Sequence, residues 1–132
     1  MADASFSLPI RVYYEDTDAA GVVYYANYLR FLERARTEWL AFLGHDVVEL
    51  ASAHGIVFIV RRVEIDYLKP ARLCDLLDVS VSVHTLGRAS LIVHQRVLRG
   101  GEALVHASVR LACVDRDRML PTRIPSFLDL NP

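Results

Sequence analysis

Two carboxylates and a glycine stand just ahead of the longest helical pattern in the sequence. Asp16 and Asp18 lie two residues apart, and Gly21 follows three residues after the second aspartate. The first turn of a helix carries N–H groups that have no acceptor within the helix. A carboxylate beside such donors suits acyl transfer. In such a reaction the carboxylate would attack an activated acyl carbon, or would deprotonate the water that attacks it. Backbone amides near Tyr25 and Ala26 would hold the oxyanion.

Each of these residues also has a plainer interpretation. Aspartates before a helix favour turns and complement the helix dipole, and Gly21 permits a sharp turn as well as the close approach of a ligand. Glu33 and Glu38 lie with arginines on the charged side of the helical pattern, which favours a solvated helix face. The residue types alone therefore leave turn-forming and catalytic roles open for the aspartates.

Other catalytic patterns are missing from the sequence. The five histidines show no H-x-x-x-H spacing, so we expect no metal site. There is no G-x-S-x-G elbow, and a serine hydrolase is therefore not indicated. Cys74 and Cys113 lack C-x-x-C spacing, which favours buried, reduced thiols.

The helix that positions this chemistry is predicted over Asn27–Leu43. Gly44 suits the position after its end. A second, short helix is predicted from Asp46, which forms a capping-box pattern with Glu49, to Gly55. The apolar residues that recur at helical spacing in the first helix are Tyr28, Phe31, Leu32, Ala35, Trp39, Phe42 and Leu43.

From residue 56 onward the apolar period changes to two, which predicts strands at 56–67, 75–86, 89–98 and 103–115. A short strand at Pro9–Tyr14 precedes the helix, after a loose lead-in over Met1–Leu8. The tail from Met119 to Pro132 is expected to lie over the surface. Tight turns such as Gly100-Gly101 imply antiparallel pairing. One long helix on one antiparallel sheet is an α+β, two-layer architecture.

Composition limits the functions open to the chain. The 132 residues suit a single domain spanning 1–132. A net charge of −1 without a basic block gives no support for a nucleic-acid partner. The sequence contains no apolar run of about 18 residues, so we expect no transmembrane segment. The first eight residues lack the pattern of a signal peptide, so we expect a cytoplasmic protein.

One specific block carries a resemblance: Asp16-x-Asp18-x-x-Gly21-x-Val23-x-Tyr25-x-Asn27-Tyr28, followed by Phe31, Glu33 and Arg36. It resembles the signature of hotdog-fold acyl-CoA thioesterases of the 4-hydroxybenzoyl-CoA thioesterase family, most closely their Tol-Pal-associated bacterial branch. The resemblance covers nearly the whole chain. Its later blocks are Tyr67-Leu68-Lys69-Pro70-Ala71, Asp75, Gly87-Arg88-Ala89-Ser90 and Arg123-Ile124-Pro125.

The resemblance implies a hotdog fold, a long central helix wrapped by an antiparallel β-sheet, with Asp18 as the catalytic carboxylate and Tyr25 as oxyanion donor. Acyl-CoA is the implied substrate. Coenzyme A is part of that substrate, and no metal or other cofactor is expected. We expect a homodimer or homotetramer with the site between subunits, since a lone sheet leaves exposed edges. The expected substrate-binding residues are Gly21, Val23, Tyr67, Lys69, Arg88 and Ser90.

Tyr25 departs from the Tol-Pal branch, which often has histidine at this position, whereas hydroxybenzoyl-type members have tyrosine. If this position acts through its backbone N–H, tyrosine and histidine serve equally well there. The choice between nucleophile and general base for Asp18 stays open. The alternatives are a non-catalytic acyl-CoA-binding or envelope-complex scaffold protein and a thioesterase acting on acyl-carrier protein. A hotdog dehydratase is disfavoured because no histidine lies between Met1 and Phe42.

Overall fold

A computed structural model describes residues 6–130 of the chain. It has one long helix and a five-stranded antiparallel sheet, which confirms the predicted α+β architecture. In chain order the elements are β1 (Phe6–Arg11), η1 (Tyr14–Asp16), η2 (Tyr25–Asn27), α1 (Tyr28–Phe42), α2 (Val47–His54), β2 (Ile56–Tyr67), β3 (Leu76–Leu86), β4 (Ser90–Arg99) and β5 (Glu102–Asp115).

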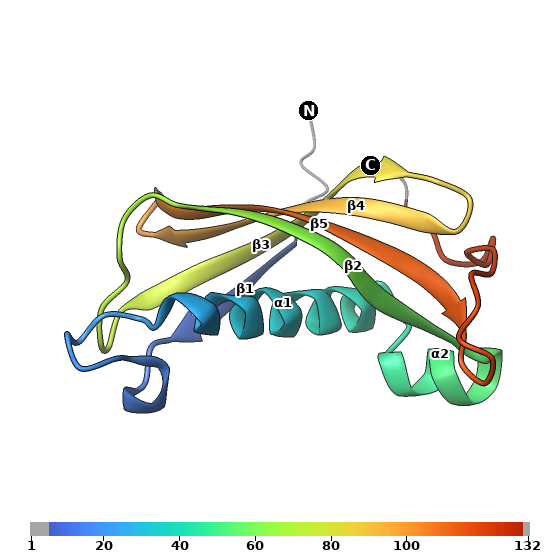
Figure 1. Cartoon of the computed structure of the whole chain (residues 1–132), viewed down its shortest axis with the longest axis horizontal. Helices are drawn as coiled ribbons and strands as arrows, with labels where there is room; N and C mark the ends of the chain where they lie inside the picture. Colours follow the sequence, from blue (N-terminus) through green and yellow to red (C-terminus); the bar gives the residue numbers. More distant parts are fainter. Residues whose placement is uncertain (1–5, 131–132) are drawn as a thin grey trace.

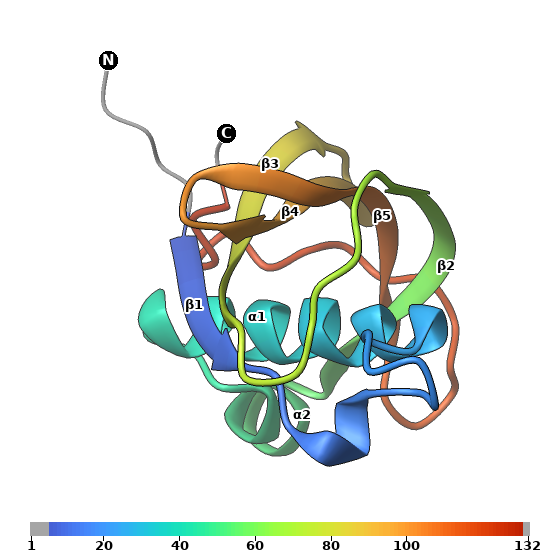
Figure 2. The same ribbon diagram turned by 90° about the vertical axis from the view of Figure 1, so that its left-hand side faces the viewer.

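The sheet curves over one side of α1 and leaves the other side uncovered (Figures 1 and 2). Its strand order is β1-β3-β4-β5-β2, so β1 and β2 are the two edges. The side chains of β3, β4 and β5 alternate between the helix and the outer face, as period-two patterns predict. The helix-facing rows form the core together with one stripe of α1. No helix within residues 6–130 is long and apolar enough to cross a bilayer.

The buried stripe of α1 confirms most of the predicted apolar positions, with one exception. Phe42 is 71% exposed and packs against Phe6 with the two rings tilted and their centroids 5.3 Å apart. Leu40, two residues earlier, takes the core position instead. The expectation for Phe42 was wrong because the helix ends there. Gly44, at φ 97°, supplies the left-handed turn that reverses the chain, and the N–H of the next residue bonds back to Leu40 O.

The short helix α2 begins and ends as its sequence predicts. Asp46 is the N-cap, and its carboxylate accepts a 2.7 Å hydrogen bond from the Glu49 N–H. Gly55 ends the helix in the left-handed conformation at φ 67°. The strand β2 then starts at Ile56, as expected.

The first strand lies earlier in the chain than predicted. Pairing with β3 runs from Phe6 to Arg11, whereas a strand over Pro9–Tyr14 was expected. The strand stops because the Tyr13 N–H donates to the Asp16 carboxylate at 2.8 Å and the chain turns into η1. The lead-in predicted over Met1–Leu8 is thus wrong for residues 6–8, and residues 1–5 lie outside the described part.

Two further expectations need correction. Cys113 is buried, and burial raises the pKa of its thiol to about 11, whereas Cys74 is exposed on a loop with φ 71°. The tail, of which residues 131–132 lie outside the described part, forms no strand in residues 119–130. It does more than cover the surface, because it inserts side chains that close one end of the core: Ile124, Leu128 and Leu130.

Candidate active site

The segment that carries the two aspartates folds into a compact hairpin directly before α1. The Asp18 N–H donates to Val22 O at 2.9 Å, and the Gly21 N–H donates to Asp18 O at 3.0 Å. Gly21 has φ 78°, and a Cβ added there would meet no atom within 4 Å. Glycine is therefore needed for the backbone conformation of the turn. Thr17 and Val23 close the hairpin as an antiparallel bridge.

The two aspartates have opposite environments. Asp16 is buried, and its two carboxylate oxygens accept hydrogen bonds from the Tyr13 N–H and from the Asn27 side-chain amide, both at 2.8 Å. Asp18 is exposed, and its Oδ1 accepts a 2.9 Å hydrogen bond from the Ala20 N–H. No donor within residues 6–130 bonds to the other Asp18 oxygen. Asp16 therefore shapes the loop, and Asp18 has the carboxylate that a ligand can reach.

The chain enters α1 through η2, whose first two residues are Tyr25 and Ala26. The Asn27 N–H donates to Tyr24 O at 2.8 Å and so orients the peptide that carries the Tyr25 N–H. In residues 6–130 neither the Tyr25 N–H nor the Ala26 N–H donates to another loop or strand carbonyl. The Tyr25 side chain is 63% exposed, and Tyr25 O accepts a 3.1 Å hydrogen bond from the Tyr67 hydroxyl.

A hollow of about 240 Å³ lies beside these donors and is lined mainly by tyrosine, aliphatic and proline side chains. The rings of Tyr25 and Tyr67 meet edge to face at 6.1 Å, and Tyr28 lies 5.6 Å from Tyr67. Burial raises the pKa of the Tyr67 hydroxyl, and the neighbouring Tyr25 adds to this. Four of the predicted site residues thus come together here. The full lining is Val23, Tyr25, Tyr28, Tyr67, Leu68, Lys69 and Pro70.

Residues 70–75, which we call the crosspiece, form hydrogen bonds with both the hairpin and α1. The Val23 N–H donates to Ala71 O at 2.9 Å, and the Leu73 N–H donates to Gly21 O at 3.3 Å. The Ala71 N–H in turn donates to the buried Tyr28 hydroxyl at 3.0 Å. Burial raises the pKa of Tyr28, although the Ala71 hydrogen bond acts in the opposite direction. The hairpin, the crosspiece and α1 are thereby fixed to one another.

A charged cluster flanks the hollow. Lys69, a predicted substrate-binding residue, pairs with Glu102. Arg99 pairs with Glu102 at 3.1 Å and with Asp75 at 2.7 Å. Hydrogen bonds from Lys69 and Arg99 lower the pKa of Glu102. Burial raises the pKa of Asp75, but the Arg72 N–H and the Arg99 guanidinium outweigh burial, so the net pKa is lowered.

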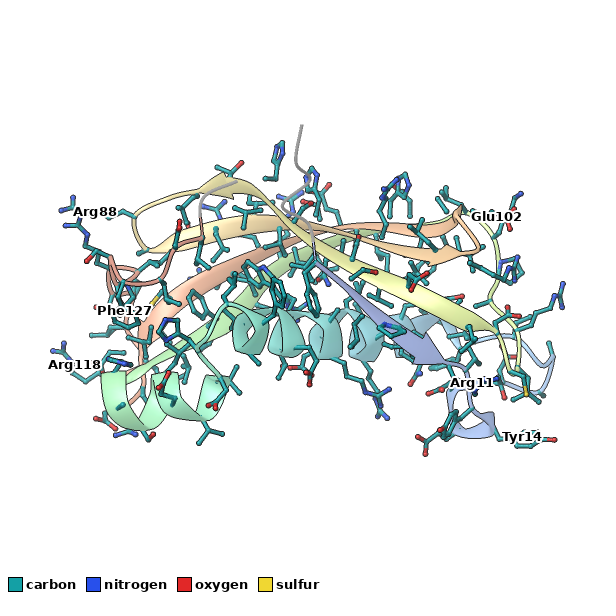
Figure 3. All side chains as sticks on the ribbon, turned by 180° about the vertical axis from the view of Figure 1, so that it is seen from behind. Arg11, Tyr14, Arg88, Glu102, Arg118 and Phe127 are labelled. Carbon is teal, nitrogen blue, oxygen red and sulfur yellow. The ribbon has the colours of Figure 1, made fainter. Side chains whose placement is uncertain are left out.

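The structure places two predicted substrate-binding residues elsewhere. Arg88 and Ser90 lie at the start of β4, at the opposite end of the molecule from Tyr14 and Glu102 (Figure 3). The ten residues of β4 span roughly 30 Å. Arg88 borders a hollow of about 660 Å³ that also contains Arg123. A single chain therefore does not unite Arg88 with the hairpin of Asp18.

Sequence reasoning missed two supporting residues, Asn27 and Arg99. Asn27, directly ahead of a helix, reads as an N-cap, yet its side chain donates to Asp16 instead. Arg99 gives no signal in the sequence for this role, because its partners Pro70 and Asp75 become neighbours only when the hairpin β4–β5 meets the crosspiece. In the described part of the chain no three His, Cys, Asp or Glu side chains are grouped to hold a metal ion.

A long helix wrapped by an antiparallel sheet is the architecture of the hotdog fold. Residues 12–131 match the family model described as the thioesterase-like superfamily. The chain belongs to this superfamily and is a thioester hydrolase.

Individual relatives agree with this assignment. The chain is 46% identical over 125 residues to "Acyl-CoA thioesterase YbgC" of Haemophilus influenzae, a match that covers 95% of this chain and 92% of the relative. It is 41% identical over 124 residues to "Acyl-CoA thioester hydrolase YbgC" of Escherichia coli, covering 93% and 92%. A crystal structure of a probable thioesterase from Bartonella henselae superposes with a TM-score of 0.89 at 38% identity, covering 92% and 100%.

Proposed function

We propose that this chain hydrolyses acyl-CoA to a free acid and coenzyme A. The observation that carries the proposal is the Tyr25 N–H, which donates to no loop or strand carbonyl within residues 6–130 and belongs to a residue that lines the tyrosine-rich hollow. The similar proteins of Haemophilus influenzae and Escherichia coli are named for acyl-CoA substrates. A thioester carbonyl in this hollow would place its developing negative charge against the amide donors of the helix start.

Asp18 is the catalytic carboxylate in this proposal. Its backbone is held by two hairpin hydrogen bonds while one side-chain oxygen stays open to a ligand. Asp16 is excluded because its two oxygens are engaged by internal donors. A catalytic group must reach the reacting atoms, and only Asp18 of the two combines a fixed backbone with an accessible carboxylate.

Two routes lead from this arrangement to the same products. As a general base, Asp18 removes a proton from water, and the resulting hydroxide attacks the carbonyl carbon. The oxyanion is held by the Tyr25 N–H and collapses with cleavage of the C–S bond, and the leaving thiolate takes the proton. As a nucleophile, Asp18 forms a mixed anhydride and expels the thiolate, and water then cleaves the anhydride. Transfer of ¹⁸O from labelled water into the Asp18 carboxylate over repeated turnovers distinguishes the second route.

The active unit in this proposal is a homodimer joined through β2. The edge β1 contains Pro9, which blunts it, whereas β2 is twelve residues long and has no proline. Two β2 strands paired antiparallel around a twofold axis place the Tyr67 end of one strand beside the Ile56 end of the other. Ile59 shares a cross-strand row with Ser90 through Ala112. The dimer thus brings Arg88 and Ser90 of the partner subunit toward the hollow.

The experiment that tests the proposed function is a hydrolysis panel with the wild-type protein. Thiol release is measured from short, long and aromatic acyl-CoA, from the same acyl groups on N-acetylcysteamine, and from acyl-carrier protein. We expect turnover of acyl-CoA and a lower kcat/KM for the truncated thioesters, which lack the phosphates. Hydrolysis of the carrier-protein thioester alone would favour that donor instead. Binding of acyl-CoA without thiol release would refute the proposal.

A further inference from the structure

Arg99, the last residue of β4, touches both ends of the crosspiece 70–75. Its Nη1 donates to Pro70 O at 3.3 Å and to Asp75 Oδ2 at 2.7 Å. Its Nη2 donates to Glu102 Oε1 at 3.1 Å. The side chain is 32% exposed, so one half-buried guanidinium brackets the whole segment.

The residues between these two anchor points are the ones that support the site. Ala71 accepts the Val23 N–H, and Leu73 donates to Gly21. Arg72 forms an isolated bridge with Val22. All of these are backbone contacts, so they depend on where the crosspiece lies. Arg99 is one of the groups that hold the crosspiece, beside the Tyr28 hydroxyl, which accepts from the Ala71 N–H, and Val12, whose backbone bonds to Cys74 and Asp75.

We infer that Arg99 is a positioning residue for the reaction: it holds the crosspiece 70–75, and the crosspiece holds the Asp18 hairpin against the helix start. The catalytic part of this inference rests on the proposed function. A planar guanidinium directs several donors in fixed directions and can bond a carbonyl and two carboxylates at once. A lysine ammonium at this position would satisfy fewer of these partners.

The competing explanation is that Arg99 forms an ordinary surface ion pair with Glu102, the kind that contributes little to stability and has no local consequence. The two explanations differ in where the effect of a substitution falls. If Arg99 anchors the crosspiece, its loss should lower the exchange protection of the amides of residues 21–23. If Arg99 only forms the ion pair with Glu102, its loss should affect the amides of β4 and β5.

Amide hydrogen exchange separates these explanations without reference to activity. Arg99→Gln is compared with Arg96→Gln, a matched change on the same strand at an exposed position whose side chain makes none of the hydrogen bonds above. We expect Arg99→Gln to lower the exchange protection of the Val23 N–H by about tenfold or more. Protection of the β4–β5 amides stays as in wild type. Unchanged protection at Val23, or a loss of protection confined to the β4–β5 hairpin, would overturn the inference.

Kinetics supply the catalytic readout. We expect Arg99→Gln to lower kcat by about tenfold or more, because a small misplacement of reacting groups is costly, with KM changed less than about threefold. Arg99→Lys should recover part of the loss. In a double-mutant cycle with Asp75→Asn, the two losses should be non-additive, since both variants remove the bond between Arg99 and Asp75. Full kcat in Arg99→Gln, or strict additivity, contradicts the inference. An inactive wild type instead refutes the proposed function, and the Val23 exchange still decides on Arg99.

Discussion

The side-chain amide of Asn27 donates a 2.8 Å hydrogen bond to Asp16 Oδ1, and this bond ties the start of α1 to the loop that leads into the Asp18 hairpin. Both groups are buried. The second Asp16 oxygen accepts the Tyr13 N–H. The carboxylate therefore fixes the helix start and the end of the first strand region at one point.

Asp16→Asn should destabilise the fold. An amide at this position must turn its NH₂ group toward one of two donors, which leaves a buried donor without an acceptor. The expected loss is about 1–3 kcal/mol in the free energy of unfolding, measured by urea denaturation. Asp18→Asn, at an exposed position, should change that free energy by less than about 0.5 kcal/mol. Equal losses for the two variants would contradict the distinction between a structural and a catalytic aspartate.

Tyr25 should act through its backbone. Tyr25→Ala keeps the N–H and should retain kcat within about fivefold. Tyr25→Pro removes this N–H at the first position of the helical segment, where proline is tolerated, and the preceding residue has φ −60° and ψ 128°, as proline requires. Loss of one oxyanion donor costs about 3 kcal/mol, so kcat should fall by about 10²-fold or more. An active proline variant would remove this amide from the oxyanion site.

Because carboxylates surround Arg99, the stability of the fold should depend on pH in the acid range. The pKa values of Asp75 and Glu102 are lowered in the folded chain, so their contribution is present above the ordinary carboxyl pKa of about 4. It is lost as pH falls through the lowered values. The thermal midpoint of wild type should therefore fall more steeply below about pH 4 than that of Asp75→Asn. The difference should shrink in 1 M salt, which screens exposed pairs. Parallel pH curves for the two proteins would refute this coupling.

The proposed dimer predicts a mass of about twice the 14.9 kDa chain in sedimentation equilibrium. Val60 on β2 is 42% exposed, and Val48 on α2 is 72% exposed. Val60→Asp places a charge at the proposed pairing edge and should shift the protein toward monomer with parallel loss of activity. Val48→Asp, the same change away from that edge, should leave both unchanged. A dimer that survives Val60→Asp would place the interface elsewhere.

The periodic elements were predictable because each follows from local pattern. The strand starting at Ile56 and the caps at Asp46 and Gly55 lie where short-range rules put them. The bounds of the first strand were not predictable, because they depend on its pairing with β3. The exposure of Phe42 was not predictable either, because it depends on where α1 ends. The site divides in the same way. A motif predicts Asp18 as the catalytic candidate, but the buried bond from Asn27 to Asp16 and the distance of Arg88 from the hollow arise only from the tertiary arrangement.

The most direct test is turnover by Asp18→Asn beside Glu15→Gln, a matched loss of charge at an exposed position in the neighbouring η1. Asparagine keeps the shape and the Ala20 hydrogen bond of Asp18 but can neither accept a proton nor attack a thioester. With folding verified, Asp18→Asn should lose at least about 10²-fold in kcat on acyl-CoA, while Glu15→Gln should match wild type. Asp18→Asn turning over acyl-CoA at the wild-type rate would contradict the central claim.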